Sequence, residues 1–330
     1  MRQEQFETLY SPLWERFNRM LAGFEASAGN DGHHDAESDN PADFPGLYKT
    51  ICNHYALARS RQYSPALVAR LHRFVLRGHR QLYRPRRAWV QKAIAFIGSD
   101  FPRTLRRHRA IFYLTLLIFA VPAAVAGYLT YHDPVMIYGI MDEGQVSRVE
   151  YMYDPQNRKP GRDMNRTSET NVRMFGFYIL NNISIGFRTF AGGMLLGLGT
   201  LLSLLFNGLF LGAVAGHLSH APYAGVFWPF VAGHGAFELT AIVISGTAGL
   251  LLARALIMPG IQTRRGALKA MAPQALKLVM GAAFMLLIAA FVEAFWSPSA
   301  VPPGVRLAVA AFNWLMVSAY FVLAGRQHGS

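Results

Sequence analysis

The chain has 330 residues, of which 52% are hydrophobic and 15% are charged, with a formal net charge of +13 and one cysteine, Cys52. Soluble domains carry about 25% charged residues, so this composition excludes an ordinary soluble enzyme. The single cysteine excludes an internal disulfide and a multi-cysteine zinc site.

The positive charge is concentrated in one part of the chain. Fifteen Lys or Arg residues lie between Phe44 and Arg109, against a single acid, Asp100, and this block directly precedes the first long apolar run. Basic residues beside a membrane span are retained on the cytoplasmic side, where they attract anionic membrane lipid. The positive charge therefore favours binding to a membrane surface and argues against binding to nucleic acid.

Residues 1–109 are predicted to form a basic, helical cytoplasmic region. Periodic apolar residues, and a Ser-Pro start for the last helix, predict three helices over residues 6–24, 45–61 and 64–83. Residues 27–43 have almost no apolar content and predict a disordered loop. Residues 88–109 mix apolar and basic side chains, and we expect them to lie on the cytoplasmic membrane face.

Residues 110–330 are predicted to form the transmembrane domain, because a span needs about 20 apolar residues. The loop 132–173 is polar and is expected to be extracytoplasmic. Six spans are predicted: residues 110–131, two within 174–218, then 227–253, 278–295 and 307–325.

The number of spans depends on residues 174–218. The loop 254–277 holds five basic residues and no acid, so it should be cytoplasmic. With a cytoplasmic N-terminus, this placement requires two crossings within 174–218. The alternative has five spans, with residues 174–190 lying in the outer interface.

Together these patterns predict an all-α, polytopic membrane helix bundle with a helical cytoplasmic N-terminal region. Residues 1–25 contain no apolar run typical of a signal peptide, so the first span itself should direct insertion. We expect a multi-pass protein of the bacterial inner membrane.

Glycines at four-residue spacing predict close helix packing. They are Gly193 and Gly197, followed by Gly208, Gly212 and Gly216. Small residues let helix backbones approach each other in a membrane, where the usual hydrophobic drive is missing. Packing within one subunit is the simpler interpretation, and a homo-oligomer face stays open as the alternative.

A set of polar residues inside the apolar runs forms the candidate functional site. After Glu169 only two acids remain, Glu238 and Glu293, and both lie within predicted spans. His234 precedes Glu238 by four residues, so the two share a helix face. The remaining polar members of this set are Asn181, Asn182, Arg188 and Asn207. Ionisable residues are costly to keep in a membrane and are therefore functional candidates.

Three interpretations of this polar set compete. It could hold helices in register, with Glu238 or Glu293 neutral or paired with Arg188 or His234. It could line a path for an ion, a proton or a small solute. It could be catalytic, although no zinc-protease or serine-hydrolase motif is present. One His and one Glu make a poor metal site, so no metal and no cofactor are expected.

Several segments resemble the stage II sporulation protein M family. They are LNNISIGF (180–187), GLGTL (197–201), FNGLFLG (206–212), GHGAFELTAIVISGTAG (233–249), MPG (258–260) and AFVEAFWSP (290–298). Two upstream segments look like the N-terminal region of longer members, LYKTICNHYALARSR (47–61) and RGHRQLYRP (77–85).

This resemblance implies a bacterial membrane protein without established catalytic residues. The member that names the family looks like a scaffold for peptidoglycan hydrolases, a role that should not be carried over to this chain. Longer members are similar to proteins encoded beside a MoxR-type AAA ATPase, a von Willebrand-type domain protein and RDD membrane proteins. Those three proteins are therefore the expected partners.

The leading functional expectation is a non-enzymatic membrane scaffold or assembly subunit of an envelope complex. The alternative is a transporter or channel subunit that uses Glu238, His234 and Glu293. An intramembrane hydrolase is the weakest interpretation, since only His234 and Glu238 suggest it.

Overall fold

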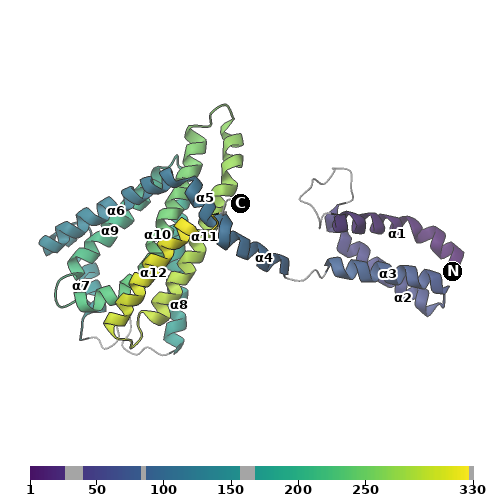
Figure 1. Ribbon diagram of the computed structural model, residues 1–330, viewed down its shortest axis with the longest axis horizontal. Helices are drawn as coiled ribbons and strands as arrows, with labels where there is room; N and C mark the ends of the chain where they lie inside the picture. Colours follow the sequence, from purple (N-terminus) through teal and green to yellow (C-terminus); the bar gives the residue numbers. More distant parts are fainter. Residues whose placement is uncertain (27–39, 83–86, 157–167, 327–330) are drawn as a thin grey trace. The chain divides into compact units, whose positions relative to one another are not determined.

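The computed structural model describes residues 1–26, 40–82, 87–156 and 168–326, and every regular element in these ranges is helical. The chain forms two compact units, Met1–Gln91 and Lys92–Ser330, which are drawn in Figure 1. The predicted all-α fold is confirmed. The first unit ends at Gln91, within helix α4 (Arg87–Ala95), whereas the predicted N-terminal region extended to residue 109.

The first unit contains three complete helices, α1 (Gln3–Ala26), α2 (Phe44–Ser60) and α3 (Pro65–Leu82). A short 3-10 turn, η1 (Pro41–Asp43), leads into α2. The largest side chains form the core: Phe6, Trp14, Phe17, Leu21, Phe44, Ile51, Leu71 and Phe74 are buried. Residues 27–39 of the loop predicted to be disordered lie outside the described residues.

Polar contacts complete the packing of this unit. The indole Nε1–H of Trp14 donates a hydrogen bond to Nδ1 of His54 at 3.1 Å, and both side chains are buried. Arg77 on α3 forms a two-pronged ion pair with Glu25 on α1, with N–O distances of 3.0 and 2.7 Å. This ion pair lowers the pKa of Glu25 and raises that of Arg77.

The second unit is a bundle of long helices. After the end of α4 come the π-helical turn η2 (Phe96–Asp100), α5 (Phe101–Arg107) and α6 (Arg109–His132). They are followed by η3 (Pro134–Gly139), α7 (Glu143–Tyr153), α8 (Ser168–Ala191), η4 (Gly192–Met194) and α9 (Leu198–Leu218). The last elements are α10 (Ala224–Ile257), α11 (Arg264–Phe291), the π-helical turn η5 (Val292–Trp296) and α12 (Pro303–Leu323).

Segment 96–107 is part of this bundle. Phe101 and Leu105 are each 3% exposed and belong to the same apolar core as residues of α10 and α11. Arg106 donates hydrogen bonds to the carbonyl oxygens of Phe321 and Ala324 at the end of α12. The segment thus packs into the helix bundle, and its location at the cytoplasmic membrane face stays a prediction.

Five helices are long and apolar enough to cross a membrane: α6, α9, α10, α11 with η5, and α12. The described residues thus hold one such helix fewer than the six spans predicted. The predicted break within 174–218 is present, since α8 and α9 are separate helices joined through η4. The missing member is α8, whose polar residues Asn181, Asn182 and Arg188 lower its apolarity.

The directions of α6 and α9 determine the direction in which α8 runs. Gly208, Gly212 and Gly216 of α9 lie against Phe119, Ala123 and Gly127 of α6, in that order, so α6 and α9 run parallel. Because α6 and α9 run in the same direction, the chain between the end of α6 and the start of α9 must run back along the bundle. Helix α8 makes this return: its start contacts Ala290 and Ala294 near the end of α11, and its last residues contact Gly249 of α10.

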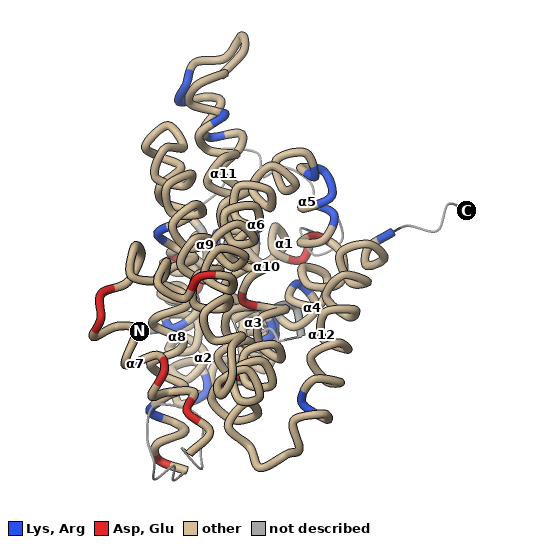
Figure 2. The backbone as a smooth tube through the Cα atoms, turned by 90° about the vertical axis from the view of Figure 1, so that its left-hand side faces the viewer, with Lys and Arg blue, Asp and Glu red and all other residues tan. Residues whose placement is uncertain are grey.

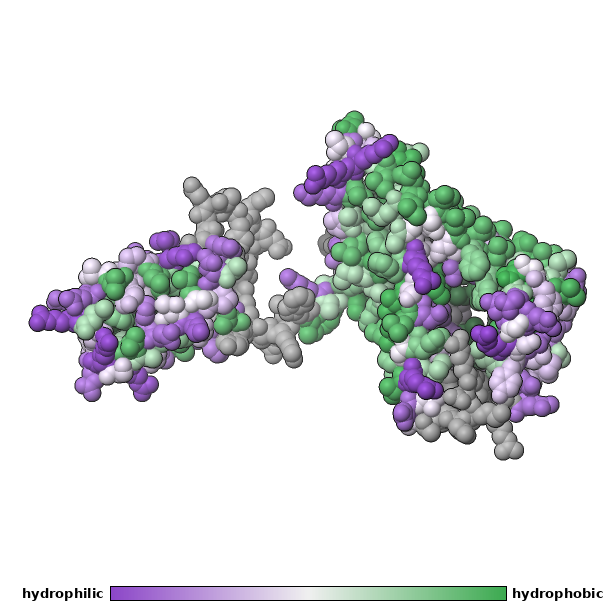
Figure 3. Space-filling view, turned by 180° about the vertical axis from the view of Figure 1, so that it is seen from behind, coloured by the Kyte–Doolittle hydropathy of each residue, from purple (hydrophilic) through white to green (hydrophobic). Residues whose placement is uncertain are grey.

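The surface of the bundle fits a lipid environment. In Figure 3 the face of the second unit is largely hydrophobic, whereas the first unit mixes hydrophilic and hydrophobic patches. Lys and Arg gather on α5 and at the start of α11 (Figure 2). The predicted loop 132–173 contains the helical elements η3 and α7, while residues 157–167 lie outside the described residues.

Candidate functional site

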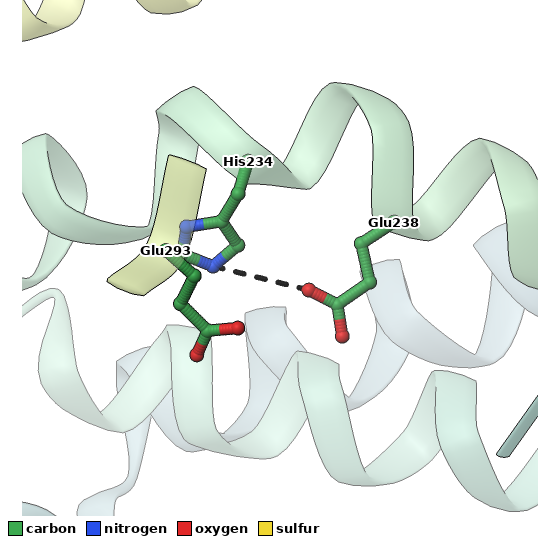
Figure 4. Close-up of side chains that lie close together, drawn as sticks. All are labelled: His234, Glu238 and Glu293. Atoms are coloured by element: carbon green, nitrogen blue, oxygen red, sulfur yellow. Dashed lines mark ion pairs between the residues drawn. The ribbon is translucent and has the colours of Figure 1, made fainter. Parts of the chain in front are cut away.

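Three of the seven polar residues singled out in the sequence come together inside the bundle. His234 and Glu238 lie one helical turn apart on α10, and Glu293 approaches them from η5 (Figure 4). Nε2 of His234 is 3.9 Å from Oε2 of Glu238. One donor atom from each of the three residues lies within 4.8 Å of the other two. His234 is 4% exposed, and both glutamates are half-buried.

Glu293 lies where the helix geometry changes locally. Helix α11 ends in the π-helical turn η5, and Glu293 is its second residue. A π-turn holds an extra residue, so the side chains that follow are rotated around the helix axis, and such turns are frequent at functional sites. Glu293 faces α10, while Ala290 and Ala294 pack with residues of α8.

Hydrogen bonds around His234 hold its ring in place. Its Nδ1 lies 3.2 Å from Oγ of Ser297, which is fully buried. Nη1 of Arg306 donates to the carbonyl oxygen of Ser297 at 2.9 Å, and Nδ2 of Asn313 donates to the carbonyl oxygen of Gly233 at 2.9 Å. With Nδ1 held by Ser297, Nε2 of His234 is left facing Glu238.

The other four predicted polar residues lie outside this cluster. Asn207 donates to the carbonyl oxygen of Ser203 one turn earlier on its own helix, at 2.7 Å. Asn181 is exposed and donates to Oδ1 of Asn182 at 3.0 Å. Asn182 is 2% exposed, and its Nδ2 has no hydrogen-bond partner. Arg188 is exposed on α8, and the described residues hold no ion pair between it and either glutamate.

The five glycines form close contacts within the chain. A Cβ atom at Gly208, Gly212 or Gly216 would collide with a backbone carbonyl oxygen of α6. Gly193 lies in the same way against Gly249 of α10. Gly197 has a positive φ of 85° directly before α9, a conformation that suits glycine. All five therefore pack helices of one subunit against each other or turn the chain.

Sequence reasoning missed Ser297, Arg306 and Asn313, which support the site from the segment 297–313. The available signal was weak, because Arg306 and Asn313 are isolated polar residues at the start of and within the last apolar run. It also missed that Glu293 would meet His234, because the two are distant in sequence and only tertiary packing brings them together.

The charges of this site restrict what it can do. Two ionised carboxylates in a site of low dielectric are costly unless protons, a cation or hydrogen bonds compensate them. Imidazole and carboxylate are also common proton-transfer groups and metal ligands. The arrangement can therefore hold a cation or exchange a proton within the bundle.

The long apolar helices, several of which pack closely through glycines, define a multi-pass helical membrane protein. Residues 115–298, more than half of the chain, match the family model of stage II sporulation protein M. The chain belongs to the stage II sporulation protein M family. Residues 4–84 match a second family, described as a domain of unknown function, DUF8413.

One curated relative extends this comparison. An uncharacterised protein of Methanocaldococcus jannaschii is 28% identical over 127 residues, which cover 38% of this chain and 71% of the relative. No solved structure matches the chain. All three site residues lie within the region that matches the family model.

Proposed function

We propose that this chain is a non-enzymatic scaffold or assembly subunit of a bacterial envelope complex, and that its first unit docks a cytosolic partner. The observation that carries the proposal is the autonomy of that unit. It has an apolar core of its own, and it matches a family model separate from that of the bundle. A folded unit beyond the membrane helices is what a subunit that recruits a partner requires.

The proposed orientation places the first unit and the basic ends of the bundle in the cytoplasm, with the protein in the inner membrane. The positive-inside rule supports this orientation, because Arg106, Arg107 and Arg109 flank the start of α6 and Arg264 and Arg265 open α11. The proposed partners follow from the family resemblance: a MoxR-type AAA ATPase, a von Willebrand-type domain protein and an RDD membrane protein.

The charge of the first unit suggests where a partner binds. Residues 44–82, which contain α2 and α3, carry seven Lys or Arg residues and no acid. Arg59, Arg73 and Arg80 are exposed on these helices. A surface of this kind attracts an acidic partner surface and accelerates encounter with it.

Docking is tested first by removal of residues 1–85. Native membrane complexes, isolated in mild detergent and weighed by mass spectrometry, should lose the cytosolic partner. A sharper variant is Arg73→Glu with Arg80→Glu, which keeps the core of the unit and reverses two exposed charges. The control is Glu15→Lys, which reverses the charge of an exposed residue on α1 and should leave the complex intact. Unchanged complexes after removal of 1–85 contradict the docking proposal.

A second candidate function is a transporter or channel subunit, which the convergence of His234, Glu238 and Glu293 favours. Intramembrane carboxylates and imidazoles mark ion and proton pathways in many transport proteins. Glu238→Gln should then abolish a flux of protons or cations into proteoliposomes that hold the intact chain. Equal flux through both proteins would exclude this function.

A further inference from the structure

We propose that His234, Glu238 and Glu293 form a binding site for one divalent transition-metal ion of the zinc class. The assignment is independent of partner docking by the first unit, and it names a ligand for the polar site in the bundle. From the sequence, His234 and Glu238 alone were too few ligands for a metal. Tertiary packing supplies Glu293 as the third ligand.

The donor set is the first argument. One imidazole nitrogen and two carboxylate oxygens lie within 4.8 Å of one another. Ligand atoms around a tetrahedral zinc ion at about 2.0–2.1 Å lie about 3.3 Å apart. Rotation of the two flexible glutamate side chains can close the remaining distance, since in Figure 4 both carboxylates lie on the side of the ring that carries the nitrogen paired with Glu238. Three protein ligands leave a fourth position for water or another ligand.

The hydrogen bonds of His234 are the second argument. A histidine that binds a metal through one ring nitrogen usually donates a hydrogen bond from the other, which fixes its tautomer and its orientation. Here Nδ1 lies 3.2 Å from Oγ of buried Ser297, and Ser297 is itself held by Arg306 through its carbonyl oxygen. Nε2 is the nitrogen that faces both glutamates. Ser297 is thus a positioning residue for a metal ligand.

Charge is the third argument. A divalent ion with two carboxylates and a neutral imidazole has no net charge, which suits a site enclosed by apolar helices. Calcium takes six to eight oxygen ligands and magnesium retains several waters, whereas zinc and its neighbours accept a mixed nitrogen and oxygen set.

The experiment measures metal binding by the full chain, purified in detergent with an affinity tag that contains no histidine. Zinc content after equilibration and removal of free ion is determined by mass spectrometry of the metal. Cobalt(II) serves as the optical probe, because its visible bands report coordination number and ligand type. We expect one ion per chain, retained in millimolar magnesium and calcium.

Substitutions assign the ion to this site. Glu238→Gln and Glu293→Gln keep side-chain size and remove one ligand charge each, so each should lower the affinity by more than about 100-fold, beyond the range for outer-shell changes. Glu293→Asp keeps a carboxylate and should retain the ion with altered cobalt bands. Ser297→Ala should weaken binding by about 10–100-fold, because it frees the imidazole ring.

A matched control is available elsewhere in the bundle. Nε2 of His217 lies 2.8 Å from Oε1 of Glu150, which forms a second histidine–glutamate pair. Glu150→Gln should leave metal content and cobalt bands unchanged. The proposal is overturned if the unaltered chain binds no zinc or cobalt. Full binding by both glutamine variants, or loss of the ion in Glu150→Gln alone, would overturn it as well.

Discussion

In the first unit the largest side chains lie inside. Trp14, Phe6 and Phe17 are at most 1% exposed, and Gly78 is the one buried glycine among its described residues. Where α6 packs against α9 in the bundle, the sizes are reversed. The contact between α6 and α9 is built on glycines, while Leu117, Phe206 and other large side chains of these helices are exposed.

The environment of each unit explains this reversal. In water, burial of apolar area stabilises a fold by about 25 cal/mol per Å², so large side chains belong inside. Lipid removes this driving force, and close backbone contact between helices becomes the main source of attraction. Small residues permit that contact, and large apolar side chains are better placed against lipid. The core of the first unit and the contact between α6 and α9 should therefore respond oppositely to changes of side-chain size.

The largest effect is expected from adding volume inside the bundle. In the double variant Gly208→Leu with Gly212→Leu, both new side chains meet backbone carbonyl oxygens of α6, which cannot rotate away. Overpacking costs about 1–3 kcal/mol per site even where neighbours can adjust, so we expect a loss of more than about 5 kcal/mol. Thermal unfolding in detergent, followed by size-exclusion chromatography, measures this loss.

The control exchanges two large residues on the exposed face of the same helix. Leu202 and Phe206 are 56% and 62% exposed, so Leu202→Phe with Phe206→Leu should leave the unfolding temperature nearly unchanged. Similar losses in both double variants would mean that the glycines are not special to the packing of α9.

Removal of volume from the first unit should have the next largest effect. Trp14 is fully buried, and truncation to alanine leaves a cavity and an unpaired His54. Such aromatic truncations cost about 3–5 kcal/mol. We expect urea unfolding of a fragment of residues 1–91 to show this loss for Trp14→Ala. Leu9→Ala on the 58% exposed position of the same helix should change stability by less than about 0.5 kcal/mol.

Sequence patterns predicted the helices well, for reasons visible in particular residues. Apolar residues at helical spacing mark α1, and long apolar runs mark α6 and α10 to α12. The break between α8 and α9 was predicted from length and loop charge. In the structure it is formed by Leu196 and Gly197, which both have a positive φ. Polar residues on α8 kept its apolarity below that of a typical span.

The candidate site was only half predictable. His234 and Glu238 share a helix face, so their spacing alone brings them together. Glu293 joins them through the packing of α11 on α10 and through the π-helical turn η5, and neither has a signal in apolar periodicity. Ser297 was missed because it precedes a proline. A serine in that position is typical of a turn and gives no sign that it contacts a histidine.

The smallest effect is expected from pH and is specific to the first unit. Burial lowers the pKa of His54 below its ordinary value of 6.5, and Nδ1 accepts the hydrogen bond of Trp14 as a neutral ring must. The unfolded chain therefore binds the proton more readily. Stability should be complete above pH 6.5 and should fall as the pH drops below that value. Thermal unfolding of the 1–91 fragment between pH 8 and about pH 5 measures this slope.

His54→Gln keeps an acceptor for the indole but does not titrate, so its slope over this range should be smaller. An equal slope in both fragments would assign the pH dependence to other groups.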